Sequence, residues 1–164
     1  MRARWSDSVQ VKAFDDDWPS MPSTPGVYVV RTNRPLRRVG GTDRAGILYL
    51  GRASSLRSRI WSFWYASHTA SGFLWTHPDI ARLVLNSRIR TVSDVERELG
   101  KLTVRFATPV HGQQLGRAER ALLFAYVTAF GEAPPLNLSL TRRWASTPSA
   151  ADLRWGEKGL QRSA

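Results

Sequence analysis

Arginine is the residue type whose number and spacing in this sequence point most directly to chemistry. Lys and Arg total 24 against 13 Asp and Glu, which gives a formal net charge of +11. Residues 31–60 contain eight arginines and one acid, Asp43, so this stretch alone carries +7. Because the planar guanidinium fork suits bidentate contact with phosphate, the stretch predicts a polyanionic partner. A solvated basic face, or a genome-wide bias toward arginine, would give the same totals.

Acidic side chains that could hold a metal ion are scarce in the second half of the chain. Glu119 is the only acid within residues 99–130, and it directly precedes an apolar run. It is therefore a better candidate ligand than Glu96, Glu98 or Glu132, which have solvated neighbours. The competing interpretation is that Glu119 only favours a helix N-terminus through the helix dipole. The absence of cysteine excludes disulfides and thiolate metal sites.

Three segments are expected to form the strands that position these groups. Val27–Val30 and Ile47–Leu50 have the β-branched and aromatic composition typical of strands. Lys101–Ala107 alternates apolar and polar side chains, which indicates a strand with one buried face. Asn33–Gly46 contains Pro35 and three glycines, so we expect a long hairpin connection that carries basic side chains.

Helices are expected after the second strand and in the second half of the chain. Ser54 or Ser55 can cap a helix that runs through Ile60. Residues 115–130 have the pattern of the longest helix, with apolar residues on every side of its middle turns, so it should be buried. Shorter helices are expected at residues 79–85 and 93–99.

Together these elements predict an α/β (α+β) domain at residues 23–140, with a small three-stranded, mainly antiparallel sheet flanked by helices. Residues 1–22 should form an extended N-terminal segment, and residues 141–164 a basic C-terminal tail over the surface. No stretch is apolar enough for a membrane span, and the N-terminus does not resemble a signal peptide. A cytoplasmic location with no membrane partner is therefore expected.

Five fragments, in this order, resemble the GIY-YIG nuclease family. Pro25–Val29 resembles the GIY half of the family motif, and Tyr49–Ala53 followed by Leu56–Ile60 resembles the YIG half and the helix after it. Glu119–Leu123 resembles the Glu-x-x-Leu-Ile of the family, and Pro135–Asn137 resembles its closing Pro-x-Asn. The resemblance extends from Pro22 to Leu138. Each fragment is weak alone, but their order along the predicted elements makes the resemblance specific.

The resemblance implies a metal-dependent endonuclease that hydrolyses phosphodiester bonds of DNA. One divalent ion, Mg²⁺ or Mn²⁺, would bind Glu119 and neutralise charge on the scissile phosphate. Tyr28 and Tyr49 would assist deprotonation of the attacking water, and Arg59 would stabilise the transition state. Asn137 would help to fix the site. At 100° per residue, Arg59 flanks the buried face of its helix and can reach over the sheet edge.

The remaining arginines are interpreted as nucleic-acid contacts. Arg34, Arg37, Arg38 and Arg44 lie in the predicted hairpin connection, where they would act as an electrostatic clamp on the backbone beside the scissile phosphate. Arg52, where many relatives carry lysine, and Arg57 would contact phosphates nearer the site. Specificity, if present, would come from the hairpin and from an insert at residues 68–90.

The sequence also departs from the family pattern. Glu119 and Asn137 are further apart than in compact members, and alignment on Asn137 would place Ala125, which cannot bind metal, at the ligand position. Phe63 stands where some members carry histidine or tyrosine. The two motif tyrosines then suffice, or another group substitutes. The candidate substitutes are Tyr65, His68 and His111.

Two alternatives to the enzyme stay open. The first is a non-catalytic nucleic-acid-binding module that keeps the nuclease fold. The second is a basic structural or interaction protein, in which Tyr28 and Tyr49 are ordinary half-buried strand aromatics. The joint presence of both tyrosines with Arg59 and Glu119 favours the enzyme, because a binder has no use for a lone carboxylate facing a polyanion.

Overall fold

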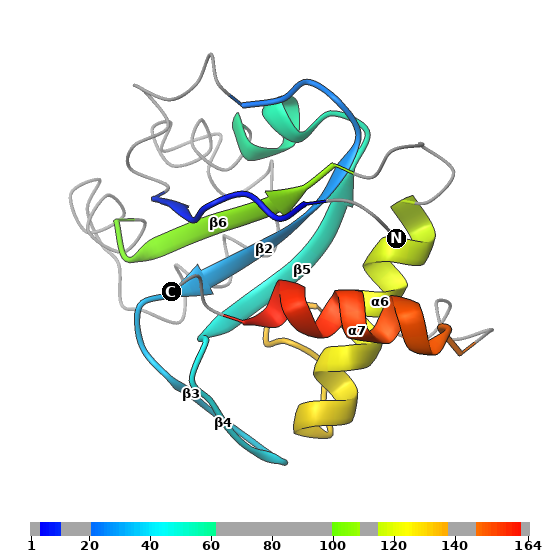
Figure 1. Cartoon of the computed structure of the whole chain (residues 1–164). Coiled ribbons are helices and arrows are strands. Elements are labelled where there is room, and N and C mark those ends of the chain that lie inside the picture. Colours follow the sequence, from blue (N-terminus) through cyan, green and yellow to red (C-terminus); the bar gives the residue numbers. More distant parts are fainter. Residues whose placement is uncertain (1–3, 11–20, 62–99, 109–114, 138–146, 162–164) are drawn as a thin grey trace.

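The computed structural model describes residues 4–10, 21–61, 100–108, 115–137 and 147–161, which are coloured in Figure 1. Their centre is a four-stranded sheet in which all neighbouring strands run antiparallel. The strands lie in the order β1 (Val9–Gln10), β6 (Leu102–Ala107), β2 (Gly26–Thr32) and β5 (Ile47–Ala53). The mixed α/β class and the three predicted strands are confirmed.

The main sheet has four strands among the described residues, one more than the three predicted. β1 lies in the segment expected to be an extended lead-in, and it pairs with β6 through Val9 opposite Val104 and Gln10 opposite Thr103. Two residues are too few to show an alternation of apolar and polar side chains. The strand can therefore be identified only from its pairing with β6 in the structure.

The central strand β2 is buried along all seven of its residues. Successive side chains point to opposite faces of the sheet. Val27 and Val29 belong to one hydrophobic cluster, and Tyr28 and Val30 belong to another on the opposite face. Burial on both faces explains why this strand is a continuous apolar run in the sequence.

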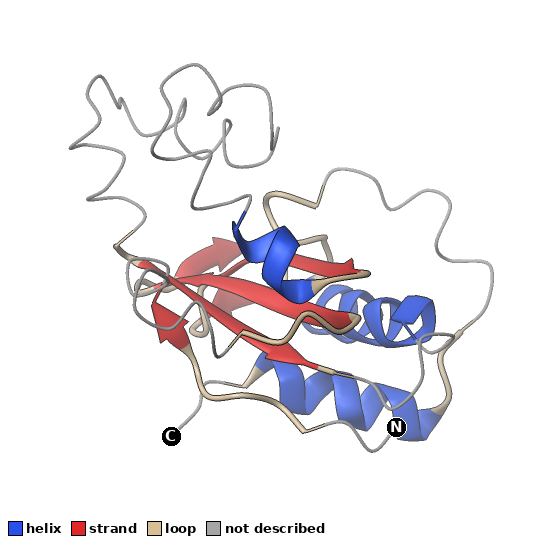
Figure 2. Cartoon of the chain, turned by 90° about the horizontal axis from the view of Figure 1, so that it is seen from above, coloured by secondary structure: helices blue, strands red, loops and turns tan. Residues whose placement is uncertain are grey.

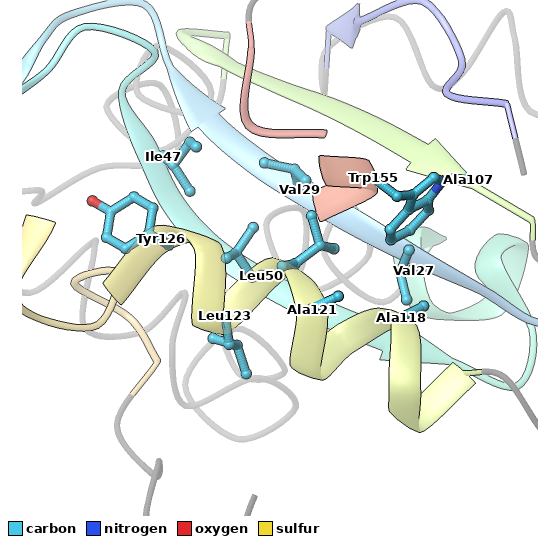
Figure 3. Close-up of a cluster of buried hydrophobic side chains, with 11 residues drawn as sticks. Val27, Val29, Ile47, Leu50, Ala107, Ala118, Ala121, Leu123, Tyr126 and Trp155 are labelled. Carbon is cyan, nitrogen blue, oxygen red and sulfur yellow. The ribbon is translucent and has the colours of Figure 1, made fainter. Parts of the chain in front are cut away.

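Helix α6 (Leu115–Phe130) covers one face of the sheet, with the bounds expected from the sequence (Figure 1). Its side chains Ala118, Ala121 and Leu122 have no exposed surface and pack with Val27 and Val29 from β2 (Figure 3). The prediction of a buried helix here is confirmed.

A shorter helix at residues 56–61 lies on the opposite side of the sheet from α6 (Figure 2). Ser55 caps this helix, because its hydroxyl accepts a hydrogen bond of 3.3 Å from the backbone N–H of Ser58. Leu56 and Ile60 are fully buried and pack in the same cluster as Tyr28. One of the two caps proposed from the sequence, Ser55, is therefore the one used.

The structure differs from the expected C-terminal tail. Residues Ala150–Leu160 form helix α7, which is capped by Ser149 and packs against α6. Trp155 is 7% exposed, and a Cβ atom at Gly156 would lie 2.6 Å from the carbonyl oxygen of Ala121. Two glycines lower the helix propensity of this segment, and packing on α6 supplies the stability that propensity does not.

The connection between β2 and β5 contains a second, two-stranded sheet of β3 (Leu36–Arg38) and β4 (Gly41–Asp43). This β3–β4 hairpin extends away from the larger sheet toward the C-terminal end of α6 (Figure 1). The helices predicted at residues 79–85 and 93–99 lie outside the described residues. Within the described part of the chain, no helix is long and apolar enough to cross a membrane.

Candidate functional site

Tyr28 and Tyr49, the two tyrosines of the predicted site, lie on neighbouring strands and on the same face of the sheet. Tyr49 pairs with Val30 in the β2–β5 register, so it is a diagonal neighbour of Tyr28. The pairing shifts between Val30 and Arg31, and this irregularity leaves Leu48 as an extra residue in β5. The two phenol rings are tilted by 34°, with centroids 5.9 Å apart. The structure therefore brings this predicted pair together.

Gly51 is required beneath the two tyrosines. It lies opposite Tyr28 in the β2–β5 register. A Cβ atom here would lie 2.6 Å from the Tyr49 ring and 2.8 Å from both the Cζ and the hydroxyl oxygen of Tyr28. Any side chain would push the rings apart. Gly51 belongs to the fragment Tyr49–Ala53 that resembles the YIG half of the motif. Its position two residues after the second tyrosine is the sequence signal for its role.

The Tyr28 phenol is held in its neutral form. Burial raises its pKa well above the usual value, and the neighbouring Tyr49 raises it further. The positive charge of Arg59 acts in the opposite direction, whereas a hydrogen bond with Tyr49 and the charge of Glu119 add to the rise in pKa. Tyr28 and Tyr49 therefore interact through their hydroxyl groups, and the buried Tyr28 phenol keeps its proton.

Arg59 lies on the helix at residues 56–61, with its side chain on the exposed side. Hydrogen bonds from the backbone N–H groups of Leu56 to Thr24 O (3.2 Å) and of Arg57 to Pro22 O (3.0 Å) fix the start of this helix against the segment that leads into β2. Arg59 is close enough for its charge to act on Tyr28. The predicted position of Arg59, beside the buried helix face and near the tyrosines, agrees with this arrangement.

Glu119 is a buried carboxylate on α6. It is 4% exposed, and its Oε2 lies 3.3 Å from the Nε of Arg52 on β5. The Arg52 side chain is 50% exposed, so its guanidinium spans from solvent to the buried acid. A Cβ atom at Gly116, one turn before Glu119, would lie 3.0 Å from the Nη1 of Arg52. Arg52, which the sequence analysis assigned to phosphate contact, is thus the ion-pair partner of the predicted metal ligand.

Asn137 forms two hydrogen bonds with the backbone of β5. Its Nδ2 donates to Leu50 O at 2.7 Å, and its Oδ1 accepts from Leu50 N at 2.9 Å. The neighbouring Leu136 N donates to Leu48 O at 3.0 Å. The Asn137 side chain therefore continues the hydrogen bonding of the sheet along the edge of β5. It does so at Leu50, which lies between Tyr49 and Gly51.

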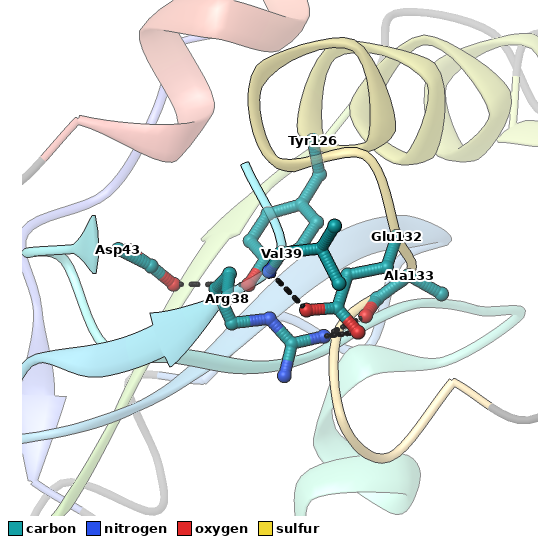
Figure 4. A network of polar contacts seen from close by, with 6 residues as sticks. All are labelled: Arg38, Val39, Asp43, Tyr126, Glu132 and Ala133. Carbon is teal, nitrogen blue, oxygen red and sulfur yellow. Dashed lines mark hydrogen bonds and ion pairs between the residues drawn. The ribbon is translucent and has the colours of Figure 1, made fainter. Parts of the chain in front are cut away.

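The arginines of the predicted clamp fall into two groups. Arg34, Arg37 and Arg44 are exposed. The Arg38 side chain is 11% exposed and lies 3.2 Å from Glu132, and it also donates to Ala133 O (Figure 4). The structure therefore uses Arg38 to attach the hairpin to the segment after α6.

Asp43 is the centre of a buried polar network at the base of the same hairpin. It is 1% exposed and accepts hydrogen bonds from the backbone N–H groups of Ala45, Gly46 and Ile47, at 2.9, 3.1 and 2.7 Å. The Tyr126 hydroxyl donates to it at 3.2 Å. Burial and the Asp43 charge raise the pKa of Tyr126 above its usual range. The sequence signal for Asp43 was its place as the single acid among eight arginines.

The other residues named from the sequence are only partly accounted for. Arg57 is partly buried, and its Nε donates to Met21 O at 2.8 Å, so it fastens its helix to the segment before β2. Phe63, the proposed substitutes Tyr65, His68 and His111, and the insert at residues 68–90 lie outside the described residues.

Glu119 is the residue of the described part of the chain that the sequence predicts as a metal ligand. No group of three or more His, Cys, Asp or Glu side chains that could hold a metal ion occurs among the described residues. Glu119 is a buried carboxylate on α6, which covers the face of the sheet opposite to Tyr28, and its charge acts on the Tyr28 phenol. Mg²⁺ is commonly bound through one or two carboxylates while it keeps water and phosphate oxygens. Glu119 therefore fits a one-carboxylate site.

No protein-family model, curated protein or solved structure matches this chain at a significant level. The geometry of the site and the charge of the chain are therefore the observations from which a function can be inferred.

Proposed function

We propose that the chain is a cytoplasmic, metal-dependent endonuclease that hydrolyses phosphodiester bonds of DNA, in the manner of the GIY-YIG family. The observation that carries the proposal is the contact of the Tyr28 and Tyr49 rings at a buried phenol on which Arg59 and Glu119 act. Tyr49 lies on the neighbouring strand β5, Arg59 on the helix at residues 56–61, and Glu119 on α6. All three act electrostatically on the buried phenol of Tyr28. The net charge of +11 supplies the attraction for a polyanionic substrate.

In this proposal the two tyrosines have different roles. Tyr28 keeps its proton because its pKa is raised, so it cannot serve as a base near neutral pH. Its hydrogen bond with Tyr49 orients that side chain. Tyr49 is only partly buried, so its hydroxyl orients the attacking water. Tyr28 is a positioning residue, and Tyr49 is the phenol that contacts the nucleophile.

The charged residues act on the phosphate. Arg59 donates to the oxygens on which charge develops in the transition state. Glu119 would hold a divalent ion, and that ion, when bound, would neutralise charge on the scissile phosphate. Arg52 is half exposed, so it can leave Glu119 and bind a neighbouring phosphate when DNA occupies the site.

One observation favours a second candidate, a nucleic-acid-binding module without turnover. The ion pair of Arg52 with Glu119 satisfies the carboxylate without any metal. In a pure binder this pair would be a permanent structural contact. The two candidates differ in one measurable outcome, which is cleavage.

The test is an incubation of the protein with plasmid, linear duplex DNA, single-stranded DNA and RNA, with Mg²⁺, Mn²⁺ or a chelator, followed by sequencing of the ends. The nuclease predicts metal-dependent cleavage that is abolished in Glu119→Gln but retained in the matched control Glu157→Gln, on an exposed position of α7. DNA binding should persist in both variants. Binding of DNA by the wild-type protein without cleavage under any metal would support the binding module and contradict the enzyme. Cleavage by Glu119→Gln would remove Glu119 as the ligand.

A further inference from the structure

The β3–β4 hairpin has one face turned to the protein and one turned to solvent. In its register Leu36 lies opposite Asp43, Arg37 opposite Thr42 and Arg38 opposite Gly41. Cross-strand partners share a face, and successive residues alternate between faces. Arg38 and Asp43 are held against the protein, whereas Arg37 and Thr42 are both exposed. The outward face is therefore centred on the Arg37–Thr42 pair.

The hairpin is fixed to the end of α6 rather than joined to it loosely. The backbone N–H of Val39 donates to Glu132 Oε1 at 2.8 Å, and the N–H of Gly40 donates to Phe130 O at 2.8 Å. Figure 4 shows the Val39–Glu132 hydrogen bond together with the Arg38–Glu132 ion pair. Its tip and its inward face are thus both attached, and the outward face has a defined position relative to the sheet.

The exposed residues of the hairpin and its flanks are basic, and its tip is apolar. Arg34 precedes β3 and Arg44 follows β4, and both are exposed. Val39 at the turn is 82% exposed, although it is a large hydrophobic residue. The one acid of the hairpin, Asp43, is buried and hydrogen-bonded to the backbone and to Tyr126. A partner that meets this face therefore meets positive charge without a compensating carboxylate from the hairpin.

We propose that this hairpin lies in the major groove of B-form duplex DNA, with Arg37 and Thr42 against the base edges. A two-stranded ribbon is about 5 Å wide between strand axes, and the B-form major groove is about 12 Å wide and admits such a ribbon. Arginine recognises guanine by a bidentate contact, and threonine can contact several bases. Arg34 and Arg44, at the base of the hairpin, contact phosphates.

This inference rests on the proposed function, since it takes nucleic acid as the substrate, and it narrows the substrate to duplex DNA. The major groove of A-form RNA is deep and narrow, and side chains cannot read it. A clamp that only tracks phosphates would bind either duplex, whereas a ribbon seated in the groove requires the B form.

The test measures binding by fluorescence anisotropy in the presence of chelator, so that cleavage does not interfere. The probes are a short DNA duplex, the same duplex with glucosylated 5-hydroxymethylcytosine, which fills the major groove without changing the backbone charge, and an RNA duplex of equal length. We expect the glucosylated DNA and the RNA each to bind about tenfold or more weakly than plain DNA, the loss typical of a missing base contact. Adding a small ligand that occupies the minor groove of the plain DNA duplex should leave the Kd of the protein for that duplex nearly unchanged.

Arg37→Ala should weaken binding to plain DNA and lose most of the discrimination against glucosylated DNA. Arg154→Ala, which removes an exposed arginine from α7, should keep that discrimination. Equal affinity of the wild-type protein for plain and glucosylated DNA would overturn the groove assignment, while cleavage in the assay above would leave the nuclease intact. Failure to bind any nucleic acid would overturn both proposals.

Discussion

The two tyrosines of the site occupy similar places in the sequence pattern but different environments in the structure. Tyr28 is 1% exposed on the central strand, whereas Tyr49 is partly exposed on the edge strand. A buried phenol with a raised pKa holds its proton. In the proposed reaction Tyr28 therefore keeps its proton and Tyr49 contacts the attacking water.

Tyr49→Phe should lower kcat for DNA cleavage by about a hundredfold or more, the range typical of a lost acid–base or water-positioning group. Tyr28→Phe should cost less, because Tyr28 acts through Tyr49. Single-turnover rates with Mg²⁺ measure both, and Tyr126→Phe, which removes the same hydroxyl far from the site, is the control. A larger loss for Tyr28→Phe than for Tyr49→Phe would reverse the two roles.

Arg59→Lys should lose about a hundredfold or more in kcat with a small change in DNA affinity. Lysine keeps the positive charge but cannot provide the planar pair of donors that a developing phosphorane requires. Arg154→Lys on α7 is the matched exposed control. If Arg57→Lys instead abolished cleavage at saturating DNA, the assignment of Arg59 to the site would be wrong.

Strand β5 is the element on which the site depends most. It carries Tyr49, Gly51 and Arg52, and among the strands of the described residues it has a neighbour on one side only. Unpaired edge groups weaken a strand and invite pairing with other chains. Asn137 covers this edge at Leu50 with both a donor and an acceptor.

Asn137→Ala should destabilise the fold by about 1–3 kcal/mol, because it leaves a partly buried backbone N–H and C=O of β5 without their partner. The free energy of unfolding from urea titration measures this, with Asn33→Ala, at an exposed position after β2, as the matched control. Activity should fall at temperatures at which the fold persists, since Tyr49 precedes the affected residue. A loss of stability no larger than that of the control would show that β5 holds its position without Asn137.

At the scale of the whole molecule, buried tyrosine phenols in the two hydrophobic cores make the free energy of unfolding depend on pH in the alkaline range. Tyr28 lies in the core on one face of the sheet and Tyr126 in the core on the other. Burial is the first cause of the raised pKa in both cases. Ionisation of either phenol would place a charge in an apolar interior.

The contribution of the Tyr28 and Tyr126 phenols to the free energy of unfolding should therefore be constant below about pH 10. It should fall as the pH rises above that value. Below the ordinary tyrosine pKa both phenols are neutral in the folded and the unfolded chain, so their contribution is complete. Above it the unfolded chain ionises and the folded chain does not, so unfolding becomes more favourable up to the raised folded-state pKa. Urea midpoints from about pH 8 to 11 measure the fall, which should be smaller in Tyr126→Phe. Ordinary titration of every tyrosine in the folded protein, seen in ultraviolet absorbance, would contradict this.

Local features of the sequence determined the main elements of the fold. The apolar runs of β2 and β5, the alternation of β6 and the 16-residue apolar helix α6 have recognisable periods, so their positions followed from the residues alone. The charge of the chain and the candidates Tyr28, Tyr49, Arg59 and Glu119 were also identified from the sequence.

Tertiary structure decided which of these residues meet and what else each one contacts. Helix α7 carries two glycines, which lower its helix propensity, and it forms because Trp155 and Gly156 pack on α6. Arg38 and Arg37 are adjacent in the sequence, yet Arg38 pairs with Glu132, about ninety residues away, and Arg37 faces solvent. Such contacts depend on which distant segments pack together, and side-chain type and spacing along the chain carry no record of that.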